Sequence, residues 1–326
     1  MIKVLDCTLR DGGYIIDWEF QRNCIRSIID NLLCAKIDFI ECGFLKECAY
    51  SPDKTFYDTP KRIDVKGGNA SLMVNFGEYS LDNFSMAYDN SPIIRVAFKK
   101  HVKNEALEYI KALKNKGWEV FANPMSTNTY TREELGELIA DLNVISPYGI
   151  SIVDTLGNMY EKDVIEIFNF IDERLEKNIA IGFHSHNSMQ LSFSNTKALL
   201  KAGFEREIII DSCVYGMGRG AGNLCTELIT KYLNDNYGKD YKISPILKII
   251  AENLNPIYDK KPWGYSTPYY IAAIHGCHPN YANFLVNQGF ADEKIDEIMN
   301  FIPEEKKTSF DKEFLLFLVS KFAVHS

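Results

Sequence analysis

Short runs rich in β-branched residues alternate with longer segments of helical period over the first two thirds of the chain. Eight of these runs have the length and composition of buried strands. They lie at residues 4–7, 38–44, 71–76, 92–98, 119–125, 149–155, 180–186 and 207–214. Eight strands with helical segments between them predict an α/β fold whose leading architecture is a parallel (β/α)8 TIM barrel. A doubly wound sheet is the main competitor, because the number of strands alone does not exclude it.

The intervening segments carry the start and stop signals of helices. Apolar residues recur at helical spacing between residues 102 and 113, and Gly117 is placed to end that helix. Thr131 and Glu134 fit a capping box in front of a second helix. Ser188 is predicted to cap the next-to-last barrel helix.

The chain has 326 residues, which exceeds the ~250 residues of a typical barrel of this kind. The segment from residue 239 onward is helical in pattern and rich in aromatic residues. We therefore expect the barrel to occupy residues 1–238. Residues 239–326 are expected to form a helical C-terminal accessory region that contributes to the active site or caps it.

Composition excludes several classes of partner. The net charge is −8 and no run of Lys and Arg interrupts it, which argues against a nucleic-acid binder. The longest apolar stretch, FLLFLV at residues 314–319, is far too short to cross a bilayer, so no membrane partner is expected. The eight cysteines form no C-x-x-C pair and the N-terminus carries no export signal. Reduced thiols in a cytoplasmic protein are therefore expected.

Functional side chains of a TIM barrel gather at the C-terminal ends of its strands. His184 and His186 alternate along the seventh predicted strand, so both imidazoles project to the same side and make half of a metal site. Taken alone, they are equally well explained as a hydrogen-bonded pair. Arg10 and Asp11 follow the first strand and, taken alone, fit a surface ion pair on a turn.

Together the two groups are more informative. Only one strand separates the first and seventh strands around a barrel, so Asp11 can meet both histidines. Two histidines and one carboxylate form a facial set that leaves positions open for a bidentate ligand. Non-haem iron oxygenases use the same set, so the ligand types alone do not fix the reaction.

The segment from Gly216 to Asn223 follows the eighth strand and contains four glycines at alternate positions. Such a loop lets the backbone pass close to a ligand or metal, or form a concavity for an anion. The side chain of Asn223 can offer an amide oxygen to a hard cation. A plain tight turn is the weaker alternative.

Three motifs in this order and spacing, LDCTLRDGGY, GFHSHN and GMGRGAGN, resemble those of the DRE-TIM metallolyase superfamily. That superfamily includes isopropylmalate and homocitrate synthases, hydroxymethylglutaryl-CoA lyase and the 4-hydroxy-2-oxovalerate aldolases. RVAF, VDTLGNMYEKDV and WGYSTPYYIAAIH are similar to segments of those aldolases. The resemblance runs from Leu5 to about His275. It implies a carbon–carbon lyase, namely a class II pyruvate aldolase that acts on a 4-hydroxy-2-oxo acid through a metal-stabilised pyruvate enolate.

The resemblance also implies the metal ligands. Asp11, His184 and His186 would hold one divalent ion, with Asn223 nearby. Manganese (Mn2+) is the expected metal, with Mg2+ or Co2+ as substitutes.

Five residues are implied or proposed for the organic substrate. Arg10 would face the 2-oxo group, where a fixed cation stabilises the enolate. Tyr265 matches a tyrosine that the C-terminal region of the aldolases presents to the active site. Asn75, Lys99 and Gly218 are further candidates for binding the substrate.

Tyr14 marks a departure from the aldolases, which carry at this position a histidine that acts as base for the 4-hydroxyl group. A phenol with an ordinary pKa of about 10 is a poor base at neutral pH, so Tyr14 is expected as a hydrogen-bond donor or a steric wall. We therefore predict an aldehyde that is larger than acetaldehyde and polyhydroxylated or anionic, such as a sugar derivative. Lys99, a second departure, would supply charge for it.

Two other functions are weighed against the aldolase. An acyl-CoA-dependent Claisen synthase or lyase uses the same barrel, but such synthases usually carry a longer C-terminal extension. A degenerate, non-catalytic barrel is disfavoured by the intact ligand set. The partners expected are therefore a small 2-oxo acid and an aldehyde. The sequence leaves the oligomeric state open, and gives no independent support for the dehydrogenase with which related aldolases pair.

Overall fold

The computed structural model describes residues 1–63, 65 and 69–323, and its centre is a closed ring of eight parallel strands. These are β1 (Ile2–Asp6), β2 (Phe39–Leu45), β4 (Asn69–Asn75), β5 (Ile93–Phe98), β6 (Val120–Pro124), β7 (Gly149–Asp154), β8 (Ala180–Ser185) and β9 (Ile208–Ser212). They follow one another around the ring, which closes through the pairing of β1 with both β2 and β9. Every predicted strand overlaps an observed one, so the predicted (β/α)8 barrel is confirmed. The two-residue strand β3 (Phe56–Tyr57), which pairs with the end of β2, was not predicted.

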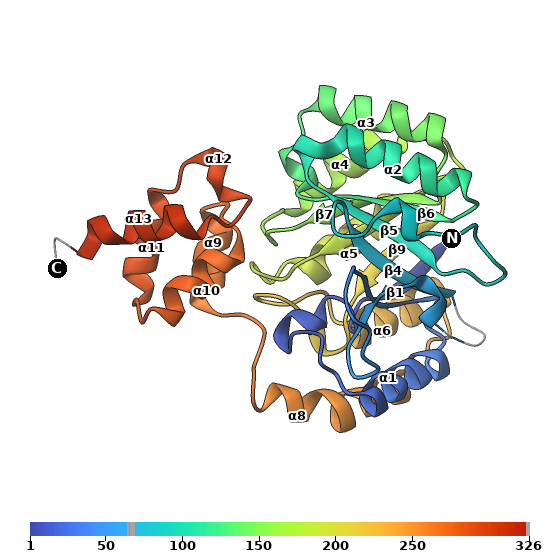
Figure 1. Ribbon diagram of the computed structural model, residues 1–326, viewed down its shortest axis with the longest axis horizontal. Coiled ribbons are helices and arrows are strands. Elements are labelled where there is room, and N and C mark those ends of the chain that lie inside the picture. The colour runs from blue at the N-terminus through green and yellow to red at the C-terminus, as the bar shows by residue number, and fades with distance from the viewer. Residues whose placement is uncertain (64, 66–68, 324–326) are drawn as a thin grey trace.

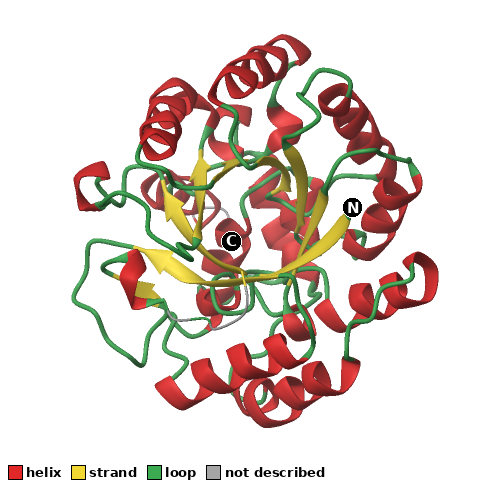
Figure 2. Ribbon diagram, turned by 90° about the vertical axis from the view of Figure 1, so that its right-hand side faces the viewer, coloured by secondary structure: helices red, strands yellow, loops and turns green. Residues whose placement is uncertain are grey.

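The long helices of the barrel surround the ring, as the view along the barrel shows (Figure 2). They are α1 (Arg22–Cys34), α2 (Lys103–Asn115), α3 (Arg132–Ile145), α4 (Glu161–Asp172), α5 (Ser192–Lys201) and α6 (Thr226–Tyr237). Strands such as β9 are buried along their whole length, which explains their near-continuous runs of isoleucine. Among the described residues, no α-helix follows β2 or β4, and longer loops occupy those two places.

The predicted helix ends can now be compared with the structure. Gly117 follows α2 with a φ of +85°, and the capping box of α3 forms as predicted. Its Thr131 Oγ1 accepts from the Glu134 N–H at 3.2 Å, and the Glu134 carboxylate accepts from the Thr131 N–H at 2.7 Å. The cap assigned to Ser188 is wrong. Helix α5 begins four residues later, and the side chain of Asn187 accepts from the Ser192 N–H at 3.3 Å instead.

The residues after the barrel form two groups of helices. The first group packs against α1 and adds to the barrel's main hydrophobic core. It consists of α7 (Ile243–Ile249), a π-helical turn at Ile250–Leu254 and α8 (Asn255–Tyr258). The second has a hydrophobic core of its own and lies beside the barrel (Figure 1). It consists of α9 (Thr267–Ile274), α10 (Pro279–Asn287), α11 (Asp292–Asn300), α12 (Glu304–Lys307) and α13 (Lys312–Ala323). We call this second group the C-terminal helices.

A division of the chain at residues 238 and 239 stays a prediction, and residues 324–326 of the predicted accessory region lie outside the described residues. The C-terminal helices meet the loops that follow the barrel strands. Lys99 donates to Ser309 Oγ at 2.9 Å and Asn158 donates to the Ala273 carbonyl at 3.4 Å. These two hydrogen bonds place the C-terminal helices next to the end of the barrel where the active site of a TIM barrel is expected.

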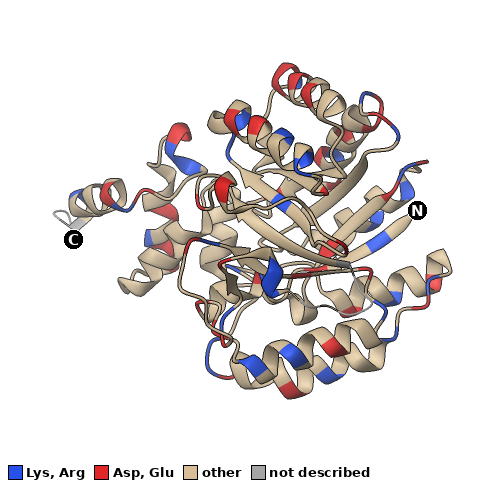
Figure 3. Ribbon diagram, turned by 45° about the vertical axis from the view of Figure 1, so that its right-hand side comes forward, with Lys and Arg blue, Asp and Glu red and all other residues tan. Residues whose placement is uncertain are grey.

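Lys and Arg residues are interspersed with Asp and Glu residues along the outer helices (Figure 3). Within the described residues, no helix combines the length and the apolar character that crossing a membrane would need. All eight cysteines are free thiols.

Candidate metal centre

A tight turn after β1 directs two charged side chains into the barrel. The Cys7 carbonyl accepts from the N–H groups of Arg10 and Asp11, at 3.0 and 2.8 Å. Arg10 is 6% exposed and Asp11 1%, and the two side chains form an ion pair with each other. The pair is therefore buried at the mouth of the barrel, unlike the surface ion pair that the two residues would fit when taken alone.

His184 and His186 extend from the end of β8 toward Asp11. Each imidazole is held through its Nδ1 atom: that of His184 lies 3.0 Å from Asp211 Oδ2, and that of His186 lies 3.0 Å from the Asp154 carbonyl. Their Nε2 atoms lie 3.6 and 3.9 Å from the two carboxylate oxygens of Asp11. The structure thus brings together the three residues that the sequence singled out as ligands.

Two buried acceptors at this point have no hydrogen-bond partner, namely His186 Nε2 and Asn223 Oδ1. Leaving such atoms unpaired is costly, and a bound cation would satisfy both. The Asn223 amide nitrogen donates to Asp11 Oδ1 at 3.1 Å, which fixes the direction of its oxygen. A Cβ at position 218 would lie 2.0 Å from that nitrogen and would force the Asn223 side chain to move. The donor set, two imidazoles with a carboxylate and an amide oxygen, fits a divalent cation.

Burial and neighbouring charges keep Asp11 and His186 in the protonation states that a cation requires. Burial raises the pKa of Asp11, but Arg10 and the two imidazoles outweigh it and hold that pKa well below its usual range. Burial lowers the pKa of His186 to about 3, so this ring is neutral at physiological pH. Burial lowers the pKa of His184, but the adjacent carboxylates of Asp11 and Asp211 outweigh it and raise that pKa.

Six buried groups, three of them carboxylates, form a closed ring through the barrel interior, with side chains at most 7% exposed. In order they are Arg10, Glu41, Arg95, Asp211, His184 and Asp11, and the ring closes from Asp11 back to Arg10. We call it the charged ring. Glu41 bridges the two arginines of the ring. One of its carboxylate oxygens lies 2.6 Å from Arg10 Nε and the other lies 3.1 Å from Arg95 Nη1.

Arg95 spans the interior of the barrel between β2 and β9. Its Nη2 pairs with Asp211 and lies 3.5 Å from Ser151 Oγ. Interiors of TIM barrels are usually filled by branched apolar side chains. Here a guanidinium and two carboxylates occupy that space, so the support of His184 is ionic.

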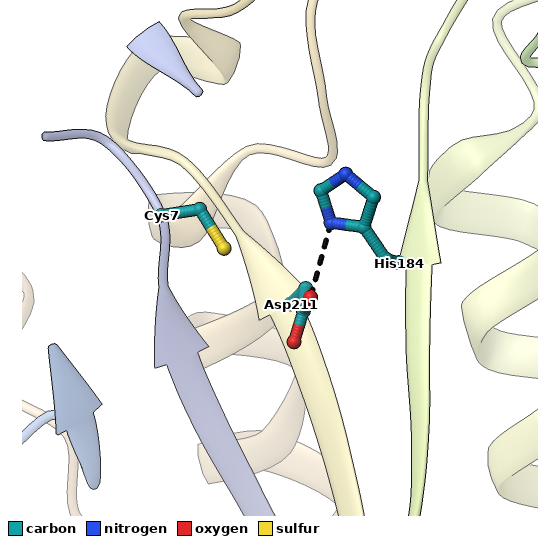
Figure 4. Close-up of side chains that lie close together, drawn as sticks. All are labelled: Cys7, His184 and Asp211. Atoms are coloured by element: carbon teal, nitrogen blue, oxygen red, sulfur yellow. Dashed lines mark ion pairs between the residues drawn. The ribbon is translucent and has the colours of Figure 1, made fainter. Parts of the chain in front are cut away.

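A second group of potential ligands, Cys7, His184 and Asp211, shares one histidine with the first (Figure 4). Burial raises the pKa of the Cys7 thiol well above its ordinary value, so it stays protonated. Asp211 is already bound by Arg95 and by Nδ1 of His184. The donor chemistry therefore favours the Asp11 side for a metal and leaves Asp211 to orient His184.

Tyr14 lies beside the metal centre in a 3₁₀ turn (Gly12–Ile15), against Trp18 and Phe44 at ring-centroid distances of 4.6 and 6.4 Å. The Cζ atom of Arg219 lies 4.8 Å from the centroid of its ring. Burial raises the pKa of Tyr14 although Arg219 acts in the opposite direction. The phenol is therefore protonated at neutral pH, which supports a donor and not a base.

Three other predicted substrate residues are Asn75, Lys99 and Tyr265. Asn75 is half-buried at the end of β4 and Lys99 is exposed after β5. Tyr265 is 56% exposed and lies near Tyr270, with tilted rings whose centroids are 6.5 Å apart. Among the described residues, no hydrogen bond or ion pair joins these three to the ligands, so their roles stay predictions.

Sequence reasoning gave no role to Arg95, Asp211 or Arg219. A signal existed for Arg95, since a lone arginine inside the apolar run of β5 must find a buried partner. Asp211 faces the same interior as His184 on the neighbouring strand, a relation visible only once the strand register is known. Arg219 stood in the glycine loop without a partner that the sequence could identify.

Comparison with known proteins gives related enzymes. Residues 93–249 match the HMGL-like family model. The chain is 26% identical to the 4-hydroxy-2-oxovalerate aldolase of Thermomicrobium roseum over 85% of this chain and 81% of that one. It is 23% identical to the oxaloacetate decarboxylase of Mycobacterium tuberculosis over 71% and 69% of the two chains. The N-terminal domain of a candidate aldolase from Bacteroides vulgatus superposes with a TM-score of 0.75 and 25% identity, over 90% and 99% of the chains.

Proposed function

From the HMGL-like domain that this chain carries in residues 93–249, we propose that the protein is a divalent-metal-dependent aldolase. It is a carbon–carbon lyase that joins pyruvate to an aldehyde, or releases both from a 4-hydroxy-2-oxo acid. The observation that carries the proposal is the meeting of Asp11, His184 and His186 beside Arg10, with buried acceptors left unpaired. The likeness to 4-hydroxy-2-oxovalerate aldolases over most of the chain supports it.

Asp11, His184 and His186 would hold the metal, and the amide oxygen of Asn223 would face it. The bound cation supplies Lewis-acid chemistry toward the oxygens of a 2-oxo carboxylate. Manganese is the metal we propose, because a carboxylate and an amide oxygen suit it and two imidazoles are less suited to magnesium.

Arg10 is fixed for recognition of the 2-oxo group. Its Nε is held by Glu41 and its Nη1 by Asp11. Nη2 has no hydrogen-bond partner among the described residues and is the nitrogen left to face the substrate. A guanidinium held from two sides stabilises developing enolate charge without having to reorganise. In the condensation direction, Tyr14 would hold the proton that the new 4-oxygen takes up.

Removal of the metal is expected to abolish the first half of the reaction. Exchange of the pyruvate methyl protons with deuterium, followed by NMR, measures enolisation without any aldehyde. We expect exchange in manganese-loaded protein, loss after dialysis against EDTA, and recovery when Mn2+ is restored. Exchange that survives complete metal removal would refute a metal-dependent aldolase. A mass-spectrometric screen of aldehydes with pyruvate then identifies the second substrate.

The substitution Arg10→Lys tests the role of the planar guanidinium group of Arg10. Lysine keeps a positive charge but cannot hold Glu41, Asp11 and the substrate together. We expect the exchange rate to fall by about 100-fold, with metal content per chain unchanged by elemental analysis. An Arg10→Lys protein that exchanges at the wild-type rate would remove Arg10 from the mechanism.

Decarboxylation of oxaloacetate is a second candidate, favoured by the relative from Mycobacterium tuberculosis. It needs the same binding of a 2-oxo acid and the same stabilisation of enolate charge, but no aldehyde. Release of carbon dioxide from oxaloacetate, measured with the same protein, distinguishes the two. The Claisen synthase stays an alternative, which a screen with pyruvate and acetyl-CoA addresses. A cytoplasmic location also stays a prediction.

A further inference from the structure

The glycine loop before α6 carries a cation that the charged ring does not include. Arg219 lies over the Tyr14 ring, and its backbone N–H points at Asp11 Oδ1 at 3.5 Å. Its Nε is buried without a hydrogen-bond partner. Among the described residues, no carboxylate forms an ion pair with its guanidinium. A buried donor without a partner costs free energy, which a ligand that brings an anion would recover.

His278 presents a further donor from the C-terminal helices. It caps the N-terminus of α10, where its Nδ1 accepts from the Asn280 N–H at 3.2 Å. The ring hydrogen is therefore on Nε2, which has no partner among the described residues. Burial, together with the nearby cations of Arg219 and Lys99 and the imidazole of His186, lowers the pKa of His278 to about 2. The ring is thus a neutral N–H donor close to both cations.

Lys99 reaches the same region from the end of β5. Its Nζ donates to Ser309 Oγ at 2.9 Å, and no carboxylate among the described residues pairs with it. The positive charge is therefore held in place by a neutral hydroxyl, which leaves it free to act on a ligand.

The glycines on either side of Arg219 show how closely the glycine loop approaches both Asp11 and the start of α10. A Cβ at Gly218 would lie 2.9 Å from Asp11 Oδ1, and a Cβ at Gly220 would lie 3.3 Å from the Cβ of Pro279. Arg219 thus stands between the metal centre and the start of α10. A substrate that extends from the metal toward the C-terminal helices must pass its guanidinium.

We propose that the aldehyde substrate carries a negatively charged group, a carboxylate or a phosphate, which Arg219, Lys99 and the His278 N–H bind at the mouth of the barrel. The inference rests on the proposed aldolase function and deepens it. The sequence left polyhydroxylated and anionic aldehydes as alternatives. The guanidinium of Arg219, which has no carboxylate partner among the described residues, favours the anionic aldehyde. Acetaldehyde has no group that could use these donors.

The reaction itself is an ordinary aldol addition. Pyruvate C3 loses one proton and forms a bond to the aldehyde carbon, while the aldehyde oxygen takes up one proton. The charged group of the aldehyde does not react. Its binding energy holds the acceptor carbon near the enolate, so its loss appears mainly in the specificity constant.

The test compares aldehydes in matched pairs with full-length, manganese-loaded protein and pyruvate. D-glyceraldehyde 3-phosphate is compared with D-glyceraldehyde, and succinic semialdehyde with butanal. We expect kcat/KM for at least one anionic member to exceed that of its neutral match by tenfold or more. The pair with the larger ratio tells a phosphate from a carboxylate.

Arg219→Met should lower kcat/KM for the preferred anionic aldehyde by about 10- to 100-fold and remove most of the preference. Arg132→Met is the matched control, because Arg132 lies on α3 with a side chain 67% exposed and paired with Glu166. It should keep the wild-type preference.

Each contrary result has a separate meaning. Equal specificity constants within both pairs, in a wild-type protein that still exchanges the pyruvate methyl protons, overturn the anion site and spare the aldolase. A preference that survives Arg219→Met overturns the assignment to Arg219. Absence of proton exchange in the wild type overturns the proposed function and this inference with it.

Discussion

Replacement of Arg95 by methionine is expected to lower the free energy of unfolding by about 3–5 kcal/mol. The guanidinium is 1% exposed and lies between Glu41 and Asp211. Methionine would fill much of the volume but leave two carboxylates facing each other in the barrel interior. Urea unfolding followed by circular dichroism measures the effect. Arg132→Met, which removes an exposed arginine from the outer surface, should change the same quantity by less than about 0.5 kcal/mol.

The loss in free energy of unfolding caused by Arg95→Met should depend on pH. Burial raises the pKa of Asp211, but Arg95 and His184 outweigh it and keep that pKa below its ordinary value. In the wild type, the stability that Asp211 contributes is therefore present at neutral pH and lost as the pH falls through its lowered pKa. Without Arg95 the carboxylate loses its strongest stabilising partner, so the variant should differ least from the wild type in acid. A loss below 1 kcal/mol at pH 7 would show that Arg95 is not essential to the charged ring.

His186→Ala is expected to weaken metal binding by about 100-fold or more while leaving the fold intact. His186 is the better choice for this test, because its one side-chain hydrogen bond among the described residues is to the Asp154 carbonyl. His184→Ala also removes a member of the charged ring. Metal content by elemental analysis and the midpoint of urea unfolding together separate the two effects.

The two histidine variants should therefore differ in stability. We expect His186→Ala to unfold near the wild-type midpoint, and His184→Ala to unfold earlier because Asp211 loses a partner. Both should lose enolisation. Full metal occupancy in His186→Ala would contradict the ligand assignment, and equal stability of the two variants would contradict the structural role of His184.

The barrel and the ligand set were open to prediction because both rest on short-range patterns. Alternation of side chains along β8 puts His184 and His186 on one side whatever surrounds them. The position of Asp11 followed from one relation around the ring, that of the first strand to the seventh. These features need only the period of a strand and the order of strands in a barrel.

The charged ring and the contact with the C-terminal helices depend on long-range packing. Glu41, Arg95 and Asp211 come from three strands far apart in the chain, and their meeting depends on the register of each. The position of His278 near Arg219 depends on how the core of the C-terminal helices packs against the barrel. Ser188 failed as a cap for a local reason, since the neighbouring Asn187 offers an amide oxygen to the first turn of α5.

Closure of the barrel has a consequence for the order of events during synthesis. The strand that completes the ring, β9, lies more than 200 residues after β1, and the hydrogen bond between Asp11 and Asn223 spans 212 residues. Pairing over such a distance comes late, because the chain entropy of closing the loop is lost before any contact forms. A ribosome-bound chain that ends before β9 would have both histidines but no carboxylate held against them. We therefore expect affinity for a divalent metal to arise in the final stage of folding.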